Sequence, residues 1–227
     1  MNQLTFTLKT TPTFKLNCSQ LTPNCLAGLS LKKIGAIKLG AYHYSPVVAD
    51  FFDISGEDCS QILFNNASVQ LDYIGHKMTT GSLLITGDVG DFLGANMRGG
   101  SIICQGNTGN RAGDQMRRGL MLIEGNAGDF TASRMIAGTI GILGTTGSYT
   151  GYAMRRGTLI LTQTPSLLAT IQDCGTHTLP YLSLLFKSFA HINQKFYALA
   201  NNRVQLFAGD LSVNGTGEIL VLKNAPH

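Results

Sequence analysis

The chain has 227 residues, a formal net charge of +4, and 44% hydrophobic against 13% charged residues. This composition excludes an intrinsically disordered chain, which carries few apolar residues and many charges. No segment approaches the roughly 18 consecutive apolar residues of a membrane span, and the opening MNQLTFTLKTTP lacks the order of a signal peptide. We therefore expect a cytoplasmic protein, and neither a membrane nor a nucleic acid as its partner.

Residues 1–60 precede the repetitive part of the chain. They contain a β-prone opening, LTFTLK, and later the run FFDISGEDC, in which Gly56 and Cys59 stand one 19-residue interval before Gly75 and Met78. This spacing predicts a degenerate first unit of the repeat that follows. We expect the rest of the segment to cap one end of that repeat, because an open end would expose unpaired strand edges.

Residues 61–165 repeat with a 19-residue period. Each unit opens with one glycine, carries a second three positions later and holds a methionine further on. The opening glycines are Gly87, Gly106, Gly125 and Gly144, and the methionines are Met78, Met97, Met116, Met135 and Met154. Between them lie short β-prone runs: SLLIT, SIICQ, LMLIE, TIGIL and TLILT. Runs this short do not form a sheet alone, so they must stack on their counterparts in neighbouring units.

This stacking predicts an all-β coil of about five 19-residue rungs with equivalent residues above one another. The methionines and two apolar columns should face the interior. The columns are Leu83, Ile102, Met121, Ile140, Leu159 and Ile85, Cys104, Ile123, Ile142, Leu161. A hexapeptide β-helix needs multiples of six, calcium-binding repeats need GGxGxD, and a leucine-rich repeat needs LxxLxLxxN with its asparagine ladder; we find none of these.

Polar residues give little sign of catalysis or metal binding. The five cysteines form no CxxC pair, so we expect reduced core residues and no metal site. The column Asp72, Asp91, Asn110, Asp129, Ser148 is interpreted as turn residues that accept backbone hydrogen bonds. His76 shares a column with Ala95, Asp114, Ser133 and Tyr152 and is expected at the surface. The recurrent glycines lack the strand and helix context of a nucleotide-binding loop.

Arginine is concentrated in the repeat, which holds seven of the eight arginines between Arg98 and Arg156. Two adjacent columns contain Arg98, Arg117, Arg155 and Arg118, Arg156. Stacking would gather them into a basic stripe that can hold an extended anion or a carboxylate-rich partner. The alternative is that they solvate the edge and pair with neighbouring carboxylates.

Residues 166–227 lack the repeat and are expected to cap its other end. Leu182, Leu185, Phe186 and Phe189 are spaced as on one face of a helix that begins near Pro180. The chain then finishes with two strand-like runs around a glycine-rich turn, VQLFAGDLSVNGTGEILVLK.

The repeats, the FDISGED segment and the closing GDLSVNGTGEIL together resemble the C subunit of formylmethanofuran dehydrogenase and of the bacterial formyltransferase/hydrolase complex. The repeat also resembles the C-terminal domain of glutamate synthase. The resemblance implies a right-handed parallel β-helix that serves as a non-catalytic scaffold, with no catalytic residue and no cofactor of its own.

The same resemblance implies the chemistry of the partners. In the bacterial complex, amidohydrolase-like A, B and formyltransferase D subunits move a formyl group between tetrahydromethanopterin and a methanofuran-type carrier and release formate. An archaeal molybdenum or tungsten dehydrogenase, or a stand-alone domain like that of glutamate synthase, are the alternatives. Such carriers bear glutamate-rich tails, and Arg117, Arg118, Arg155 and Arg156 are the residues we expect to contact a tail or an acidic partner.

Overall fold

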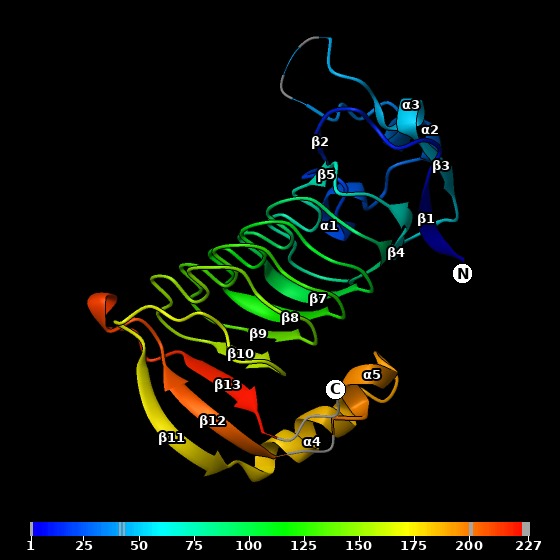
Figure 1. The fold of residues 1–227 in the computed structure, drawn as a ribbon. Coiled ribbons are helices and arrows are strands. Elements are labelled where there is room, and N and C mark those ends of the chain that lie inside the picture. Colours follow the sequence, from blue (N-terminus) through cyan, green and yellow to red (C-terminus); the bar gives the residue numbers. More distant parts are fainter. Residues whose placement is uncertain (1, 41, 43, 200–201, 224–227) are drawn as a thin grey trace.

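The structure is a computed structural model that describes residues 2–40, 42, 44–199 and 202–223. It is mostly β, as expected, and is dominated by one mixed sheet of eleven strands in the order β11-β12-β13-β10-β9-β8-β7-β6-β4-β1-β3 (Figure 1). The strands of the N-terminal part are β1 (Gln3–Leu8), β2 (Leu16–Asn17), β3 (Phe52–Ser55), β4 (Asp58–Ala67) and β5 (Leu71–Asp72). Its helices are α1 (Pro23–Leu26), α2 (Leu31–Gly35) and α3 (Val48–Phe51).

The repeat supplies the centre of the sheet, and the C-terminal part completes it. The repeat strands are β6 (Ser82–Gly87), β7 (Arg98–Cys104), β8 (Arg118–Ile123), β9 (Thr139–Ile142) and β10 (Thr158–Leu161). The C-terminal elements are β11 (Gln172–Thr178), α4 (Pro180–Ser188), α5 (Gln194–Tyr197), β12 (Arg203–Ala208), the 3-10 helix η1 (Leu211–Val213) and β13 (Glu218–Leu222). No helix in these described ranges is long and apolar enough to cross a membrane.

Strands β6 to β10 pair in parallel, and residues pair with those 19 positions further on, as in Leu83↔Ile102. The exception is Arg98, which pairs with Arg118, 20 positions on, at an irregularity before Ser101. A second line of parallel bridges joins the turns through Val89, Thr108, Ala127 and Thr146. Successive turns of the chain therefore contact each other on more than one side, and Figure 1 shows them stacked along one axis.

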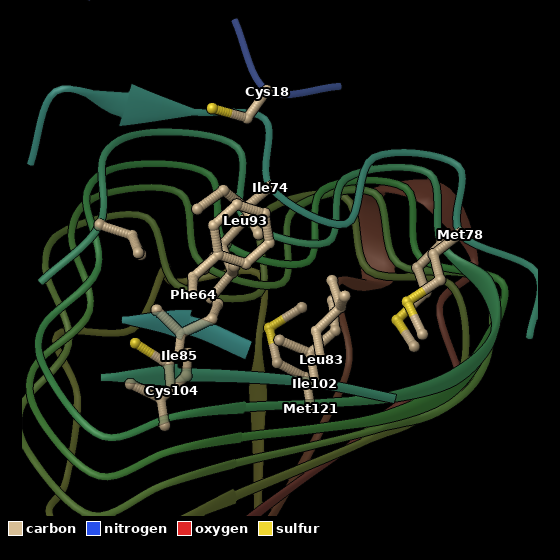
Figure 2. Close-up of a cluster of buried hydrophobic side chains, with 14 of the residues drawn as sticks. Cys18, Phe64, Ile74, Met78, Leu83, Ile85, Leu93, Ile102, Cys104 and Met121 are labelled. Atoms are coloured by element: carbon tan, nitrogen blue, oxygen red, sulfur yellow. The ribbon is translucent and has the colours of Figure 1, made fainter. Parts of the chain in front are cut away.

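The interior is formed by the predicted columns. The five methionines that recur at the 19-residue interval are buried, and so are both apolar columns, each residue with 0–1% of its surface exposed. Figure 2 shows Leu83, Ile102 and Met121 grouped together, with Ile85 and Cys104 beside them. A glycine follows each methionine by three positions, and from the second unit on it makes room for the methionine of the turn before. A Cβ on Gly100, for example, would lie 2.6 Å from Cε of Met78. The two columns are therefore complementary in shape.

The first turn of the stack is built from two separate segments. Strand β1 pairs in parallel with β4, so that Phe6 lies beside Phe64. The opposite side comes from residues near the start of the chain, where β2 pairs with β5 and the Cys18 amide donates to the Asp72 carbonyl at 2.9 Å. The predicted degenerate unit is wrong, because Cys59 lies inside β4 rather than at a methionine position.

The last turn is also completed from a distance. Strand β13 pairs in parallel with β10, with Ile219 beside Leu159, although these two residues are far apart in the sequence. The two predicted strands at the end of the chain are confirmed as the antiparallel pair β12 and β13. The predicted helix is confirmed as α4, which begins at Pro180. Strand β11 was not predicted.

Helices α4 and α5 cover the outward face of the repeat strands. Ile103, Leu122, Ile160 and Leu220 form a second buried cluster with three phenylalanines of this part of the chain, Phe186, Phe189 and Phe196. The buried carboxylate of Glu124 holds α5 in place, because it accepts hydrogen bonds of 2.6 Å from both Lys195 and Asn193.

Gly141 lets Phe196 approach the sheet, since a Cβ at this position would lie 2.6 Å from the Phe196 ring. We expect Gly141→Leu to displace α5 and to lower the free energy of unfolding by about 1–3 kcal/mol, the usual cost of overpacking. Thermal or urea unfolding of the variant measures this. The double variant Gly141→Leu/Phe196→Ala should recover part of the loss; if the two losses simply add, the steric explanation is wrong.

Candidate partner-binding surface

The four arginines that the sequence singles out lie together on one edge of the stack. Arg117, Arg118, Arg155 and Arg156 are all exposed. They stand where the chain leaves each methionine for the next strand, and the Arg117 and Arg155 amides donate to the carbonyls of Met97 and Met135 at 2.8 and 2.9 Å. The backbone ladder therefore fixes their position along the stack.

The basic stripe is interrupted, because the turn between the two pairs carries Ile136 and Ala137 at the equivalent positions. The pairs are two turns apart, which places their backbones about 10 Å from each other. Within the described residues, none of these four guanidinium groups makes a hydrogen bond or an ion pair. The alternative that they pair with neighbouring carboxylates does not apply to these four residues.

Arg134 has a different role, because it turns to the buried carboxylate of Asp114. Its Nε and Nη2 donate to the two carboxylate oxygens at 3.0 and 2.7 Å. The Ser133 hydroxyl donates to the same carboxylate at 2.6 Å, and the side-chain amide of Gln115 donates to it at 3.1 Å. Asp114 is only 2% exposed, so this network satisfies a charge that would otherwise be costly to bury.

The Asp114 network predicts a measurable loss on substitution. Alanine fits at this position, because Ala95 occupies it one turn earlier, but Asp114→Ala leaves Ser133 without an acceptor. The side chain of Arg134 is 47% exposed and can turn to water. We therefore expect a loss of about 1–2 kcal/mol rather than the larger cost of a fully buried pair. Urea unfolding measures it, with Arg134→Met as the matched variant; no change in either would contradict this account.

The column of His76 is more buried than expected. Ala95, Asp114 and Ser133 are buried, and His76, which was predicted at the surface, is half-buried. Burial and the charge of Lys77 lower the pKa of His76. Polar residues in this column do not imply exposure, because Asp114 and Ser133 are hydrogen-bonded inside the corner.

Two polar ladders support the turns. The predicted ladder is confirmed. One side-chain oxygen of each of its first four members accepts a hydrogen bond from the backbone amide of the equivalent residue one turn later, at 2.7–2.8 Å; these members are Asp72, Asp91, Asn110 and Asp129. A second ladder was missed, although its asparagines follow the opening glycines in the sequence. It runs through Asp88, Asn107, Asn126 and Thr145.

A further column was also missed. Tyr73, Phe92, Arg111, Phe130 and Tyr149 follow the same 19-residue spacing and lie above one another on the outside of a corner. We call these five residues the aromatic ladder. The rings of Tyr73 and Phe92 stack with centroids 4.6 Å apart, and those of Phe130 and Tyr149 4.8 Å apart. The regular spacing in the sequence was the signal that could have revealed it.

The cysteines match the prediction only in part. Cys18 and Cys104 are buried and free, and burial raises the pKa of Cys104 to about 12. Cys25 and Cys174 are exposed, so the expectation of a core position is wrong for them. In the described part of the chain, no group of three or more His, Cys, Asp or Glu side chains is placed to hold a metal ion.

Known proteins resemble this chain in both sequence and fold, although no protein-family model matches it. The C subunit of a tungsten-containing formylmethanofuran dehydrogenase 2 from Methanococcus maripaludis is 29% identical over 92 residues, which cover 40% of this chain and 34% of the relative. The Fhc C subunit of the formyltransferase/hydrolase complex of Methylorubrum extorquens is 31% identical over 76 residues, 34% of this chain and 29% of the relative.

A solved structure matches over nearly the whole chain. It is a chain of the crystal structure of the formyltransferase/hydrolase complex (FhcABCD) from Methylorubrum extorquens in complex with methylofuran. The likeness has a TM-score of 0.61 and 30% identity, and covers 97% of this chain and 100% of that one. The chain belongs to the C-subunit family of these complexes.

Membership of the C-subunit family agrees with the resemblance noted in the sequence. The aligned segments span only about a third of the length of the two curated relatives, 34% and 29%. The structural likeness extends beyond the repeat to both flanks, since it covers 97% of the chain. The C-subunit family therefore accounts for the whole described fold, and not for the repeat alone.

Proposed function

We propose that this chain is the non-catalytic scaffold subunit of a formyltransferase/hydrolase complex that works in the cytoplasm. The observation that carries the proposal is the likeness over 97% of the chain to a chain of the FhcABCD complex. The partners are an amidohydrolase-like A subunit, a B subunit and a formyltransferase D subunit. They transfer a formyl group between tetrahydromethanopterin and a methanofuran-type carrier and release formate, while this subunit holds no cofactor of its own.

The scaffold role fits the architecture that we propose for it. Residues 61–165 form a right-handed parallel β-helix of about five 19-residue rungs, and residues 1–60 and 166–227 act as its caps. The parallel register of β6 to β10 and the second line of parallel bridges, which begins at Val89, support this description. Such a coil offers a rigid, elongated surface against which several partners can be held at fixed spacing.

A strain that lacks this chain tests the scaffold role. We expect the other subunits to fail to assemble and formyl-transfer and hydrolase activity in cell extracts to fall to background. The chain expressed again in these cells should restore both, whereas the chain purified by itself should have neither activity. Full activity of the remaining subunits without it, or activity of the isolated chain, would contradict the proposal.

The exposed arginines Arg117, Arg118, Arg155 and Arg156 are the proposed contact with a glutamate-rich carrier tail or with the acidic face of a partner. Their exposure and their lack of a partner among the described residues support this proposal. Arginine suits it because the planar guanidinium binds carboxylates in a bidentate manner.

Charge reversal tests this contact. We expect Arg118→Glu/Arg156→Glu to weaken assembly or to raise the KM for the carrier by at least about tenfold, with the effect largest at low salt. The control is Lys32→Glu/Lys33→Glu, which changes the charge equally on the exposed side of α2. Equal assembly and kinetics of the two double variants would remove the arginines from the proposal.

A tungsten- or molybdenum-dependent formylmethanofuran dehydrogenase is the second candidate. It is favoured by the 29% identity over 92 residues to the C subunit of the tungsten-containing enzyme. Metal analysis of the purified native complex distinguishes the two. Stoichiometric tungsten or molybdenum in a partner subunit would support the dehydrogenase, and its absence with formyl-hydrolase activity present would support the transferase.

A further inference from the structure

The aromatic ladder lies on a different part of the stack from the four exposed arginines. All five of its residues have left-handed backbone, with φ between 58° and 63°. Bulky side chains are uncommon in this conformation, because the Cβ crowds the following carbonyl. The backbone alone does not call for aromatic residues here. The neighbouring left-handed column holds five mixed residues: Lys77, Asn96, Gln115, Arg134 and Ala153.

Arg111 is the centre of the ladder. Its guanidinium lies 4.5 Å from the ring centroid of Phe130 and 6.0 Å from that of Phe92. The guanidinium therefore lies over the ring of Phe130 and, at a longer distance, over that of Phe92, while the N–H donors point from its edge. Among the described residues, no oxygen accepts a hydrogen bond from this edge, and no carboxylate forms an ion pair with it.

The acidic residues near Arg111 already have partners. Asp114, the nearest along the chain, accepts hydrogen bonds from Ser133 and Arg134. In the adjacent column, Asp91 accepts the Asn110 amide and Asp129 accepts the Ser148 amide. A planar set of donors that is held rigid and has no acceptor loses little conformational entropy when it binds a carboxylate in a bidentate manner. Arg111 is therefore ready to receive a carboxylate from outside the chain.

The exposed surroundings indicate what carries that carboxylate. Tyr149 and Tyr152 are 48% and 44% exposed, and Tyr152 packs edge-on against Phe130. Tyrosine, phenylalanine and arginine are enriched at the centres of protein interfaces. A polyanionic tail would instead need several cations, and these lie in the other group, at Arg117, Arg118, Arg155 and Arg156. The occupant that fits is a single carboxylate on a protein surface.

We propose that the aromatic ladder is a docking site for a partner subunit, which places one Asp or Glu side chain on the edge of Arg111 between the rings of Phe92 and Phe130. The inference rests on the proposed function, since it needs the chain to be part of a hetero-oligomeric complex. It adds a second interface, separate from the arginine edge.

The test uses the complex purified through a tag on this chain. Arg111→Met keeps a flexible side chain between the rings but removes the donors, and should weaken the association of one partner subunit by at least about tenfold. Arg111→Lys, which keeps the charge without the planar fork, should restore only part of it. The control is Lys77→Met, which removes an equal charge from an exposed residue on the same side of the turns. Unfolding temperatures of all variants should match that of the wild type within a few degrees.

A photoreactive phenylalanine at Tyr149 identifies the occupant. Cross-links to a partner segment that carries an Asp or Glu support the inference. Cross-links to segments without an acidic residue, or association of Arg111→Met within twofold of wild type, overturn it and leave the scaffold role intact. If no partner subunit purifies with the chain, the proposed function itself is wrong and this inference is overturned with it.

Discussion

Replacing Phe64 with alanine is expected to lower the free energy of unfolding by about 3–5 kcal/mol, the usual cost of removing a fully buried phenylalanine. Phe64 is completely buried where the N-terminal part joins the stack (Figure 2). Its ring stacks on Phe6 with centroids 5.2 Å apart and meets Phe52 edge-on at 6.3 Å. These three rings come from β4, β1 and β3. Removing the Phe64 ring would therefore leave a cavity between the stack and the strands β1 and β3, which close its end.

The matched control is Phe14→Ala in the same part of the chain. Phe14 is 50% exposed, and among the described residues its ring contacts that of Phe51, with centroids 5.8 Å apart. We expect it to lose less than about 1.5 kcal/mol, the upper value of one aromatic pair. Chemical unfolding followed by circular dichroism measures both variants. Equal losses would mean that the buried rings do not close the end of the stack.

Asp210→Ala is expected to cost about 3 kcal/mol, because a buried charged acceptor is removed from several donors at once. In the earlier turns, the backbone amide of the residue equivalent to Ala153 donates to a carbonyl of the next turn. The Arg134 amide, for example, donates to the Tyr152 carbonyl at 2.7 Å. Ala153 stands in the last turn and has no such neighbour. The Asp210 carboxylate, only 1% exposed, accepts its amide at 2.8 Å and also binds Ser212.

The ionisation of Asp210 predicts how the stability depends on pH. Burial by itself raises the pKa of Asp210, but hydrogen bonds from Ser212, Ala153 and Thr170 outweigh it, so that the pKa lies below the usual 3.8. A carboxyl with a lowered folded pKa contributes stability above its unfolded pKa and loses it as the pH falls through the folded value. The stability difference between wild type and Asp210→Asn should therefore shrink below about pH 4. A difference that stays constant from pH 7 to pH 3 would contradict this assignment.

The interior of the stack could be predicted because its information is local and periodic. The 19-residue period places Leu83, Ile102 and Met121 in one column, and the structure has them paired in that order. Helix α4 was predicted for the same reason, since its apolar spacing and Pro180 are contiguous in the chain.

The ends of the stack could not be predicted in the same way. Nothing near Leu16 or Ile219 signals that these residues complete the first and last turns, because their partners lie far away in the sequence. The aromatic ladder was overlooked for a different reason. Phe92 and Phe130 are apolar residues of the kind expected in the core, yet they are only half-buried. The left-handed backbone that turns them outward cannot be recognised from hydrophobic periodicity.

The most direct test of the scaffold role is to tag this chain in its native host, purify it gently and identify the proteins present in equal amounts, while formyltransferase and formyl-hydrolase activities are assayed in the same fractions. Our account predicts amidohydrolase-like, B and formyltransferase subunits in fixed stoichiometry, with both activities in the purified complex. Glutamate synthase components, or a chain that purifies without a partner and without activity in its fractions, would contradict it.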